Sequence, residues 1–246
     1  MTLDRDTFLT AVTASGRLPA AYAEDVLVRL AHHSSAIEGN TLTISDTVTL
    51  LVDELLPRGG VSVREYHEVA NHRAAVVRIV CAVDADERLT DRLVRELHAL
   101  LLDHLLHDRG EYKQSSNAVI GASWQPLAPH RVPETMRHWA DQSDWQLRHL
   151  KGVNRLEAIA RSHIEFERIH PFSDGNGRVG RAVLVLQTMQ AYGVPAIVRE
   201  SNRSDYLRLL DTADASGFAE LLSANLTAET ARAAQFSVPG FTAEDR

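Results

Sequence analysis

The spacing of apolar residues along the chain predicts helices almost throughout. In residues 20–38, Tyr22, Val26, Leu30 and Ile37 lie close to one helical face. The same spacing of apolar residues recurs along most of the chain, together with residues that typically begin or end helices. The ranges predicted to be helical are 5–14, 20–38, about 45–56, 62–82, 91–107, about 134–149, 152–169, 179–191, about 202–213 and 217–233.

Two of these predicted helices are apolar on most sides. Residues 152–169 and 179–191 carry apolar side chains around most of their circumference, and this pattern is typical of buried helices. Residues 110–131 instead mix Gly, Ser, Asn and Pro with a short β-like run, which predicts an extended loop or small hairpin. The fold class expected is all-α, one compact helical domain over residues 1–246 with a short β-hairpin.

Composition narrows the class of protein. The chain has 246 residues, 44% of them hydrophobic and 24% charged, as in a water-soluble globular protein. Its net charge of −7 argues against a general nucleic-acid surface. No apolar run is long enough to span a bilayer, and the N-terminus does not resemble a signal peptide. The single cysteine, Cys81, excludes an internal disulfide and predicts a small buried residue. We therefore expect a cytoplasmic protein with no membrane or nucleic-acid partner.

The turn between the two buried helices combines several kinds of chemistry. It reads HPFSDGNGRVGR from His170 to Arg181. The glycines before the second helix favour an anion site, because the first N–H groups of a helix are unpaired and the helix dipole adds positive potential. Arg178 and Arg181 are three residues apart and share a helix face, so a polyphosphate suits the site better than a single carboxylate.

Two further side chains in this turn suggest a reaction. Asp174 could hold Mg²⁺ against phosphates, since hard cations take oxygen ligands. His170 has the side chain most suited to act as a general base on an attacking hydroxyl. Each part alone is common in ordinary turns, but their coincidence between two buried helices is not.

An acidic residue is expected at an unfavourable place earlier in the chain. Glu38 lies at the end of the predicted helix 20–38, just before the Gly39-Asn40 stop. An anion at a helix C-terminus costs about 0.3–1 kcal/mol unless a cation is near. Arg181 is the candidate cation.

The motif resembles the signature of the Fic family, position for position. The resemblance implies transfer of AMP from ATP to a Tyr, Thr or Ser hydroxyl of a target protein, with His170 as general base. It implies that Asp174 binds Mg²⁺. The residues that it implies in phosphate binding are Gly175, Asn176, Gly177, Arg178 and Arg181, the last of them at the γ-phosphate.

A second stretch resembles the inhibitory motif of the same family. It runs from Ser34 through Glu38 to Gly39, in a helix of about 20–38. The resemblance implies that Glu38 pairs with Arg181 and blocks the productive position of the γ-phosphate. ATP bound with Mg²⁺ would then be used only weakly until Glu38 is removed.

The resemblance extends over most of the chain. Val119, Ile120 and Gly121 resemble the start of a flap that aligns the target chain, and Tyr206 lies in a helix that resembles one contributing to the nucleotide pocket. The family-like core covers about 60–230, and no appended DNA-binding domain is expected. The residues leave a homodimer open.

Four alternatives remain at this point. The same residues could remove AMP, with Glu38 assisting water, or could transfer another nucleotide or phosphate-containing group. A nucleotide-binding module without catalysis is the third. The fourth is a metal-dependent hydrolase, because His163, Glu167 and His170 fall on one helical face at spacings that suit metal ligands.

Overall fold

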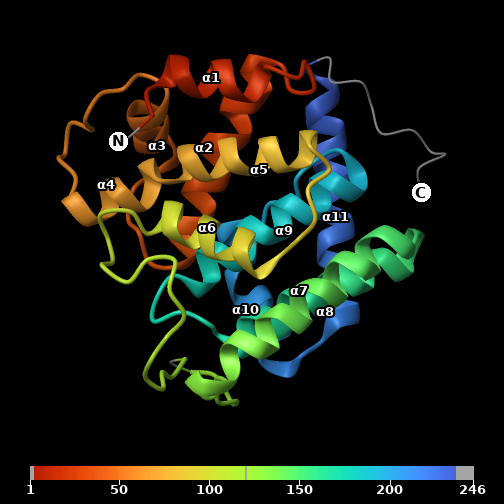
Figure 1. The fold of residues 1–246 in the computed structure, drawn as a ribbon. Coiled ribbons are helices and arrows are strands. Elements are labelled where there is room, and N and C mark those ends of the chain that lie inside the picture. Colours follow the sequence, from red (N-terminus) through yellow and green to blue (C-terminus); the bar gives the residue numbers. More distant parts are fainter. Residues whose placement is uncertain (1–2, 120, 237–246) are drawn as a thin grey trace.

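A computed structural model describes residues 3–119 and 121–236, and within them all regular secondary structure is helical (Figure 1). Two 3-10 helices, Pro129–Arg131 and Glu200–Asn202, precede α7 and α10. The α-helices are α1 (Arg5–Thr13), α2 (Ala20–Ile37), α3 (Ile44–Leu51), α4 (Val63–Ala70), α5 (His72–Asp84), α6 (Asp91–Leu101), α7 (Val132–His149), α8 (Gly152–Ile169), α9 (Asn176–Tyr192), α10 (Arg203–Thr212) and α11 (Ala215–Ala234).

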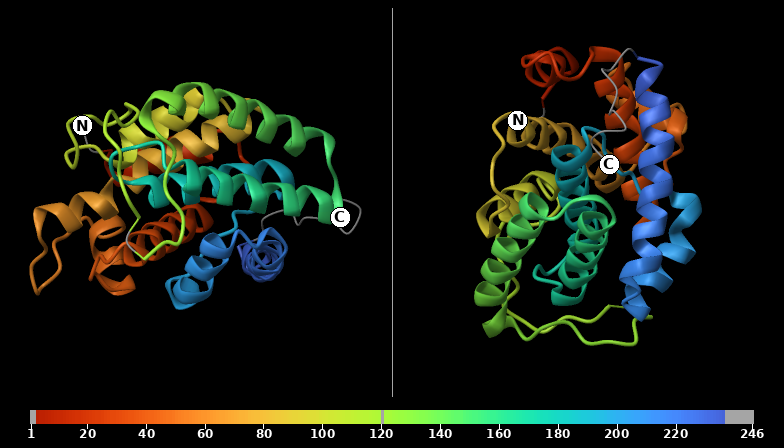
Figure 2. Two further views of the ribbon diagram at one scale, coloured as in Figure 1. Left: turned by 90° about the horizontal axis from the view of Figure 1, so that it is seen from below. Right: turned by 90° about the vertical axis from the view of Figure 1, so that its right-hand side faces the viewer.

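Helix α9 is the central element of the fold. Every residue from Arg178 to Met189 is buried, and α9 contacts α2, α5, α6, α7 and α8. Helix α11 packs along α8 on the outside, as Figure 2 shows in its right-hand view. Because other helices surround α9, most of its side chains are apolar and its sequence lacks a polar stripe along one face.

Several predicted helix boundaries were wrong; α3 ends at Leu51 rather than at about residue 56, and three others differ for local reasons. The predicted helix 62–82 is two helices, and Asn71 between them donates from its side-chain amide to the carbonyl oxygens of Leu101 and Asp103. Helix α3 is capped by Thr43 rather than Ser45, in a complete capping box with Asp46. Helix α6 ends at Leu101, followed by turns, instead of continuing to residue 107.

The predicted β-hairpin is not formed within the described residues. No strand occurs in 3–119 or 121–236, and the segment between α6 and α7 is an irregular chain of turns (Figure 1). Val119 accepts a turn hydrogen bond from the N–H of Ala122, and Gly121 has a φ of +84°. Ile120 lies outside the described residues. Within the described residues, no second strand lies beside this segment, so no β-ladder forms.

Two further observations bear on the expectations from composition. None of the helices within 3–119 and 121–236 combines the length and the apolar character that crossing a bilayer requires. Cys81 is exposed on α5, so its predicted burial was wrong.

Candidate active site

The turn from His170 to Gly175 is fixed by contacts from distant elements. Asn176 bridges it: its side-chain oxygen accepts from the Phe172 N–H at 2.9 Å, and its amide donates to the Phe172 carbonyl at 3.0 Å. His98 of α6 stacks on the Phe172 ring at 3.8 Å between centroids. His98 was not among the predicted site residues, because a single histidine on a leucine-rich helix carries no recognisable signal.

His98 also holds the backbone of the turn. Its Nδ1 accepts from the Gly110 N–H at 2.7 Å, so its Nε2 carries the hydrogen that is donated to the Asp174 carbonyl at 3.1 Å. Burial lowers the pKa of His98 to about 4, which keeps the ring neutral. A neutral ring with one donor and one acceptor matches these two backbone partners.

Gly175 is required at the start of α9 for two reasons. Its φ of +79° lies in the left-handed region that glycine tolerates best. A Cβ added there would also come within 2.6 Å of the Leu102 side chain. The glycine therefore lets the chain turn tightly into α9 against α6.

His170 ends α8 in a left-handed conformation, with a φ of +50°. Its Nδ1 lies 3.1 Å from the Glu167 carbonyl oxygen, which can only accept, so Nδ1 carries the proton and Nε2 keeps a free lone pair. Burial, and to a lesser extent the charge of Lys113, lower the pKa of His170. A neutral imidazole with a free Nε2 is the form that a general base needs.

Arg178 is buried with donors that lack acceptors. It is 3% exposed, and its Nε and Nη1 have no hydrogen-bond partner within the described part of the chain. The nearest carboxylates, Glu68 and Asp174, each lie 3.8 Å from a guanidinium nitrogen. Burial without full pairing lowers the pKa of Arg178. Such a guanidinium is suited to receive an added anion.

Arg181, in contrast, is held by α2 and by the residue that ends it. Its Nε donates to Ser34 Oγ at 3.0 Å, and its Nη2 donates to the Ser34 carbonyl at 2.8 Å and to Glu38 Oε1 at 2.7 Å. Arg181 is 2% exposed, whereas the Glu38 side chain is 40% exposed. The contact expected between Glu38 and Arg181 is therefore present, with the carboxylate open to solvent on one side.

The carboxylate of Glu38 also lies over the start of α9. A Cβ placed on Gly177 would collide with Glu38 Oε1 and would come within 3.0 Å of Arg181 Nη1. The backbone of α2 turns at this point, because Gly39 and Asn40 donate to the carbonyls of Ala36 and Ser35 in a Schellman arrangement. An anion already occupies part of the space in front of the first turn of α9.

Asp174 presents one carboxylate at the edge of this space. Its side chain is 49% exposed, and Oδ1 accepts from the Gly175 N–H at 2.6 Å. Mg²⁺ is commonly held by one or two carboxylates together with substrate phosphates and water. A single half-exposed carboxylate beside an anion site fits that mode of binding.

The other predicted site residues lie around this centre. Tyr206 is 1% exposed, and its hydroxyl lies 2.8 Å from His163 Nε2, so it is inside the core behind Arg181. The segment after α6 reaches the turn through Lys113, whose N–H donates to the Pro171 carbonyl at 2.9 Å, and through Asn117, which donates to the Phe172 carbonyl at 2.9 Å. Sequence reasoning gave Asn117 no role.

The metal-hydrolase alternative does not fit this arrangement. Both ring nitrogens of His163 are engaged, Nδ1 with the Gly180 carbonyl at 3.2 Å and Nε2 with Tyr206. Among the residues that the structure describes, no three His, Cys, Asp or Glu side chains are grouped to hold a metal ion. The helical spacing of His163, Glu167 and His170 reflects packing rather than ligation.

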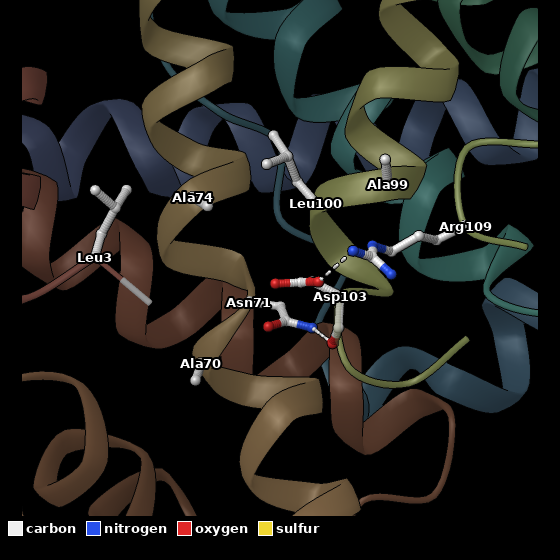
Figure 3. Close-up of a pocket in the computed structure, with 8 residues that line it drawn as sticks. All are labelled: Leu3, Ala70, Asn71, Ala74, Ala99, Leu100, Asp103 and Arg109. Atoms are coloured by element: carbon white, nitrogen blue, oxygen red, sulfur yellow. Dashed lines mark hydrogen bonds and ion pairs between the residues drawn. The ribbon is translucent and has the colours of Figure 1, made fainter. Parts of the chain in front are cut away.

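A cavity lies away from the turn and contains none of the predicted site residues. It has a volume of about 320 Å³ at the junction of α4, α5 and the end of α6 (Figure 3). Asp103 at its rim pairs with Arg109 at 3.1 Å, and Asn71 donates to the Asp103 carbonyl. Its polar groups are paired with one another, so the motif remains the better candidate for chemistry.

Fold and site together define a class of protein: an all-helical domain in which a glycine-rich helix start, a histidine and an acidic residue paired with a buried arginine lie together. Residues 88–188 match the family model described as "Fic/DOC family". These residues therefore form a domain of the Fic/DOC family.

Sequence relatives agree with this assignment. "Protein adenylyltransferase Fic" of Nematostella vectensis is 30% identical over 203 residues, which are 81% of this chain and 46% of that protein. "Protein adenylyltransferase fic-1" of Caenorhabditis briggsae is 29% identical over 74% of this chain and 36% of that protein. The chain thus spans less than half the length of these two curated relatives.

Solved structures share the fold. A Fic domain-containing signaling protein from Bacteroides thetaiotaomicron aligns with a TM-score of 0.77 at 24% identity, over 95% of this chain and 96% of that chain. Fic-1 from C. elegans aligns with a TM-score of 0.74 at 23% identity, over 95% of this chain and 72% of that chain. These likenesses place the all-helical architecture among known Fic-domain structures.

Proposed function

We propose that this protein is an adenylyltransferase that transfers AMP from ATP to a hydroxyl side chain of a target protein, and that Glu38 restrains it. The observation that carries the proposal is the contact of Glu38 with both Arg181 and the first turn of α9. The Glu38 carboxylate thereby occupies two positions that an ATP polyphosphate would need, one at Arg181 and one at the start of α9.

The donor groups for phosphate come from one helix start. The backbone N–H groups of Asn176, Gly177 and Arg178 open α9 and have no partner within that helix. The unpaired nitrogens of Arg178 add two buried donors. The Asn176 side chain holds the turn instead, so its part in binding is through its N–H group. These groups favour an anion with several charges.

The reaction follows from the position of His170 at the edge of this cradle. The target hydroxyl gives its proton to His170 Nε2 and forms a bond to the α-phosphorus of ATP, while the bond from that phosphorus to the β-phosphate oxygen breaks. Pyrophosphate leaves, and AMP remains on the target as a phosphodiester. Mg²⁺, when held by Asp174 and the phosphates, would neutralise charge on the leaving group.

Glu38 opposes this reaction by charge and by occupancy. While it pairs with Arg181, the arginine cannot hold the γ-phosphate, and the carboxylate repels the polyphosphate from the helix start. The pair is accessible from solvent, because the Glu38 side chain is 40% exposed. Release of Glu38 therefore requires no unfolding of the core.

Labelling with ATP that carries the label on its α-phosphate tests the proposal. Wild type, Glu38→Gly and Glu38→Gln are each incubated with Mg²⁺ and a cell lysate, and protein-bound label is measured. We expect labelling to rise at least about tenfold in both variants, since about 1.4 kcal/mol of lost restraint suffices for that factor.

Two histidine variants control the experiment. Adding His170→Ala to Glu38→Gly abolishes labelling, whereas adding His130→Ala, which changes an exposed histidine in a 3-10 helix, leaves it unchanged. Equal labelling by wild type and Glu38→Gly would remove the role given to Glu38. Labelling that persists without His170 would remove the role given to that base.

A further inference from the structure

Glu167 is a buried acid that the proposed reaction does not use. It is 5% exposed in α8, and its Oε1 has no hydrogen-bond partner in the described part of the chain. A Cβ on Gly180 would collide with this oxygen, so the carboxyl is pressed against α9 at the residue before Arg181. A buried carboxyl without a partner is costly if it is charged, and it calls for an explanation.

Among the residues described in the structure, Arg181 is the one cation that acts on Glu167. His163 of α8 has its Nε2 3.9 Å from the carboxyl, but burial lowers the pKa of His163 to about 3, so the ring is neutral. Tyr206 of α10 is also uncharged, because burial raises its pKa well above the usual value. The charged groups that act on Glu167 are Arg181 of α9 and Glu38 at the end of α2.

These two charges act on Glu167 in opposite directions. Burial raises the pKa of Glu167 to about 8, Arg181 lowers it and Glu38 raises it. With Glu38 on Arg181, the carboxyl therefore stays protonated at neutral pH. Removal of Glu38 leaves the attraction of Arg181 unopposed and lowers the pKa.

We propose that Glu167 is a positioning residue for Arg181, a buried carboxyl of α8 that becomes the counter-ion of the guanidinium when no anion occupies the α2 side. Glu38 and an ATP γ-phosphate are the two anions that compete with it. The inference rests on the proposed function, because it needs a polyphosphate to bind at Arg181. Glu167 thus holds the arginine in place between the departure of Glu38 and the arrival of ATP.

Because the pKa of Glu167 depends on the anion at Arg181, the affinity of the site for ATP depends on pH. An anion that binds at Arg181 raises the pKa of Glu167, so binding takes up a proton. The affinity is highest at a pH below the pKa of Glu167 in the free site. It falls as the pH rises from that value to the higher pKa of the occupied site.

Isothermal titration calorimetry on the full chain with Glu38→Gly tests the inference, with ATP and Mg²⁺ as the ligand. We expect the dissociation constant to rise about three- to tenfold from about pH 7 to about pH 9. The terminal phosphate of ATP is already ionised over this range. Titrations at about pH 7.5 in two buffers of different ionisation enthalpy should show net proton uptake.

The matched control is Glu38→Gly with Glu167→Gln, which keeps the volume of the neutral acid but cannot ionise. We expect a pH-independent affinity and no proton uptake, with thermal unfolding confirming that the variant folds. Lys113, whose pKa burial lowers to about 8, also titrates in this range. A pH dependence that survives Glu167→Gln would therefore belong to another group and would overturn the inference.

The outcomes separate this inference from the proposed function. ATP that binds Glu38→Gly with the same affinity at every pH, and without proton uptake, overturns the role of Glu167 and leaves the adenylyltransferase proposal intact. This readout does not depend on the folding of the Gln variant. No binding of ATP by Glu38→Gly at any pH overturns both.

Discussion

Lys113 and His170 show how single residues tune the proposed base. Lys113 is 3% exposed, and its Nζ donates to Asn117 Oδ1 at 2.7 Å. Its charge adds to the effect of burial on the pKa of His170, and both effects favour the neutral ring. A base works in its unprotonated form, so activity is complete above this lowered pKa and is lost as the pH falls through it.

Replacing Lys113 should shift the acid limb of the pH–activity profile, which is the pH range in which activity is lost as His170 becomes protonated. In the Glu38→Gly background at saturating ATP, Lys113→Met removes the nearby positive charge, so the pKa of His170 rises and the limb shifts up by about half a pH unit. The measurement is the rate of labelling as a function of pH. Lys113→Arg keeps the charge and should leave the limb in place. Identical limbs in Met and Arg variants would contradict the account.

The role of the Asn176 side chain could not be predicted from the motif. The presence of Asn176 at a helix start predicts an anion-binding region, and this stays a prediction, but spacing could not show that its amide is bonded to the Phe172 backbone. His98 was missed for the converse reason, since it reaches the turn only through the packing of α6 against α9. Residue roles that depend on contacts between distant elements are not visible in a local pattern.

Among the elements, the junction of α8 and α9 is held by the close approach of α6. Leu102 lies directly against Gly175. The sequence located this junction well, because two helices apolar on most sides leave little doubt that the turn between them is rigid. It did not locate the ends of α4, α5 and α6, which depend on Asn71 and on the turns after Leu101.

Gly175→Ala should destabilise the protein through both backbone strain and a clash with Leu102. We expect the free energy of unfolding to fall by about 2–4 kcal/mol. Gly193→Ala is the matched control, since Gly193 has a φ of +75° at the end of α9 with open space around it, and it should cost only about 1 kcal/mol. Urea unfolding of both variants measures the difference.

Leu102→Ala combined with Gly175→Ala separates strain from the clash. The double variant should recover part of the loss relative to the sum of the two single variants, because the added Cβ then has room. Strict additivity of the two free-energy changes would show that Leu102 does not restrict Gly175.

At the scale of the whole molecule, α11 anchors the helix that carries Glu38. Glu229 of α11 is 4% exposed and accepts from Tyr22 at 2.7 Å and from both Arg29 Nη atoms at 2.7 Å, all on α2. Asp25 of α2 in turn pairs with Arg29 and with Arg232 of α11. The prediction that residues 1–246 form one domain remains a prediction.

Glu229→Ala should loosen α2, because it leaves the buried Tyr22 hydroxyl without its acceptor and the partly buried Arg29 with Asp25 alone. We expect a loss of about 3–5 kcal/mol in the free energy of unfolding, as for other buried pairs from which one partner is removed. Hydrogen exchange should show lost protection over residues 20–37. The exposed Glu220 of α11 provides the control, and Glu220→Ala should change neither measurement.

The central claim is that the group transferred is AMP, and ATP labelled separately on its α- and γ-phosphates tests it most directly. Glu38→Gly is incubated with each form in the presence of Mg²⁺ and a lysate, and the label retained on protein is compared. The account predicts retention of the α-label alone, with the γ-label leaving in pyrophosphate. Retention of the γ-label without the α-label would show phosphoryl transfer and contradict it.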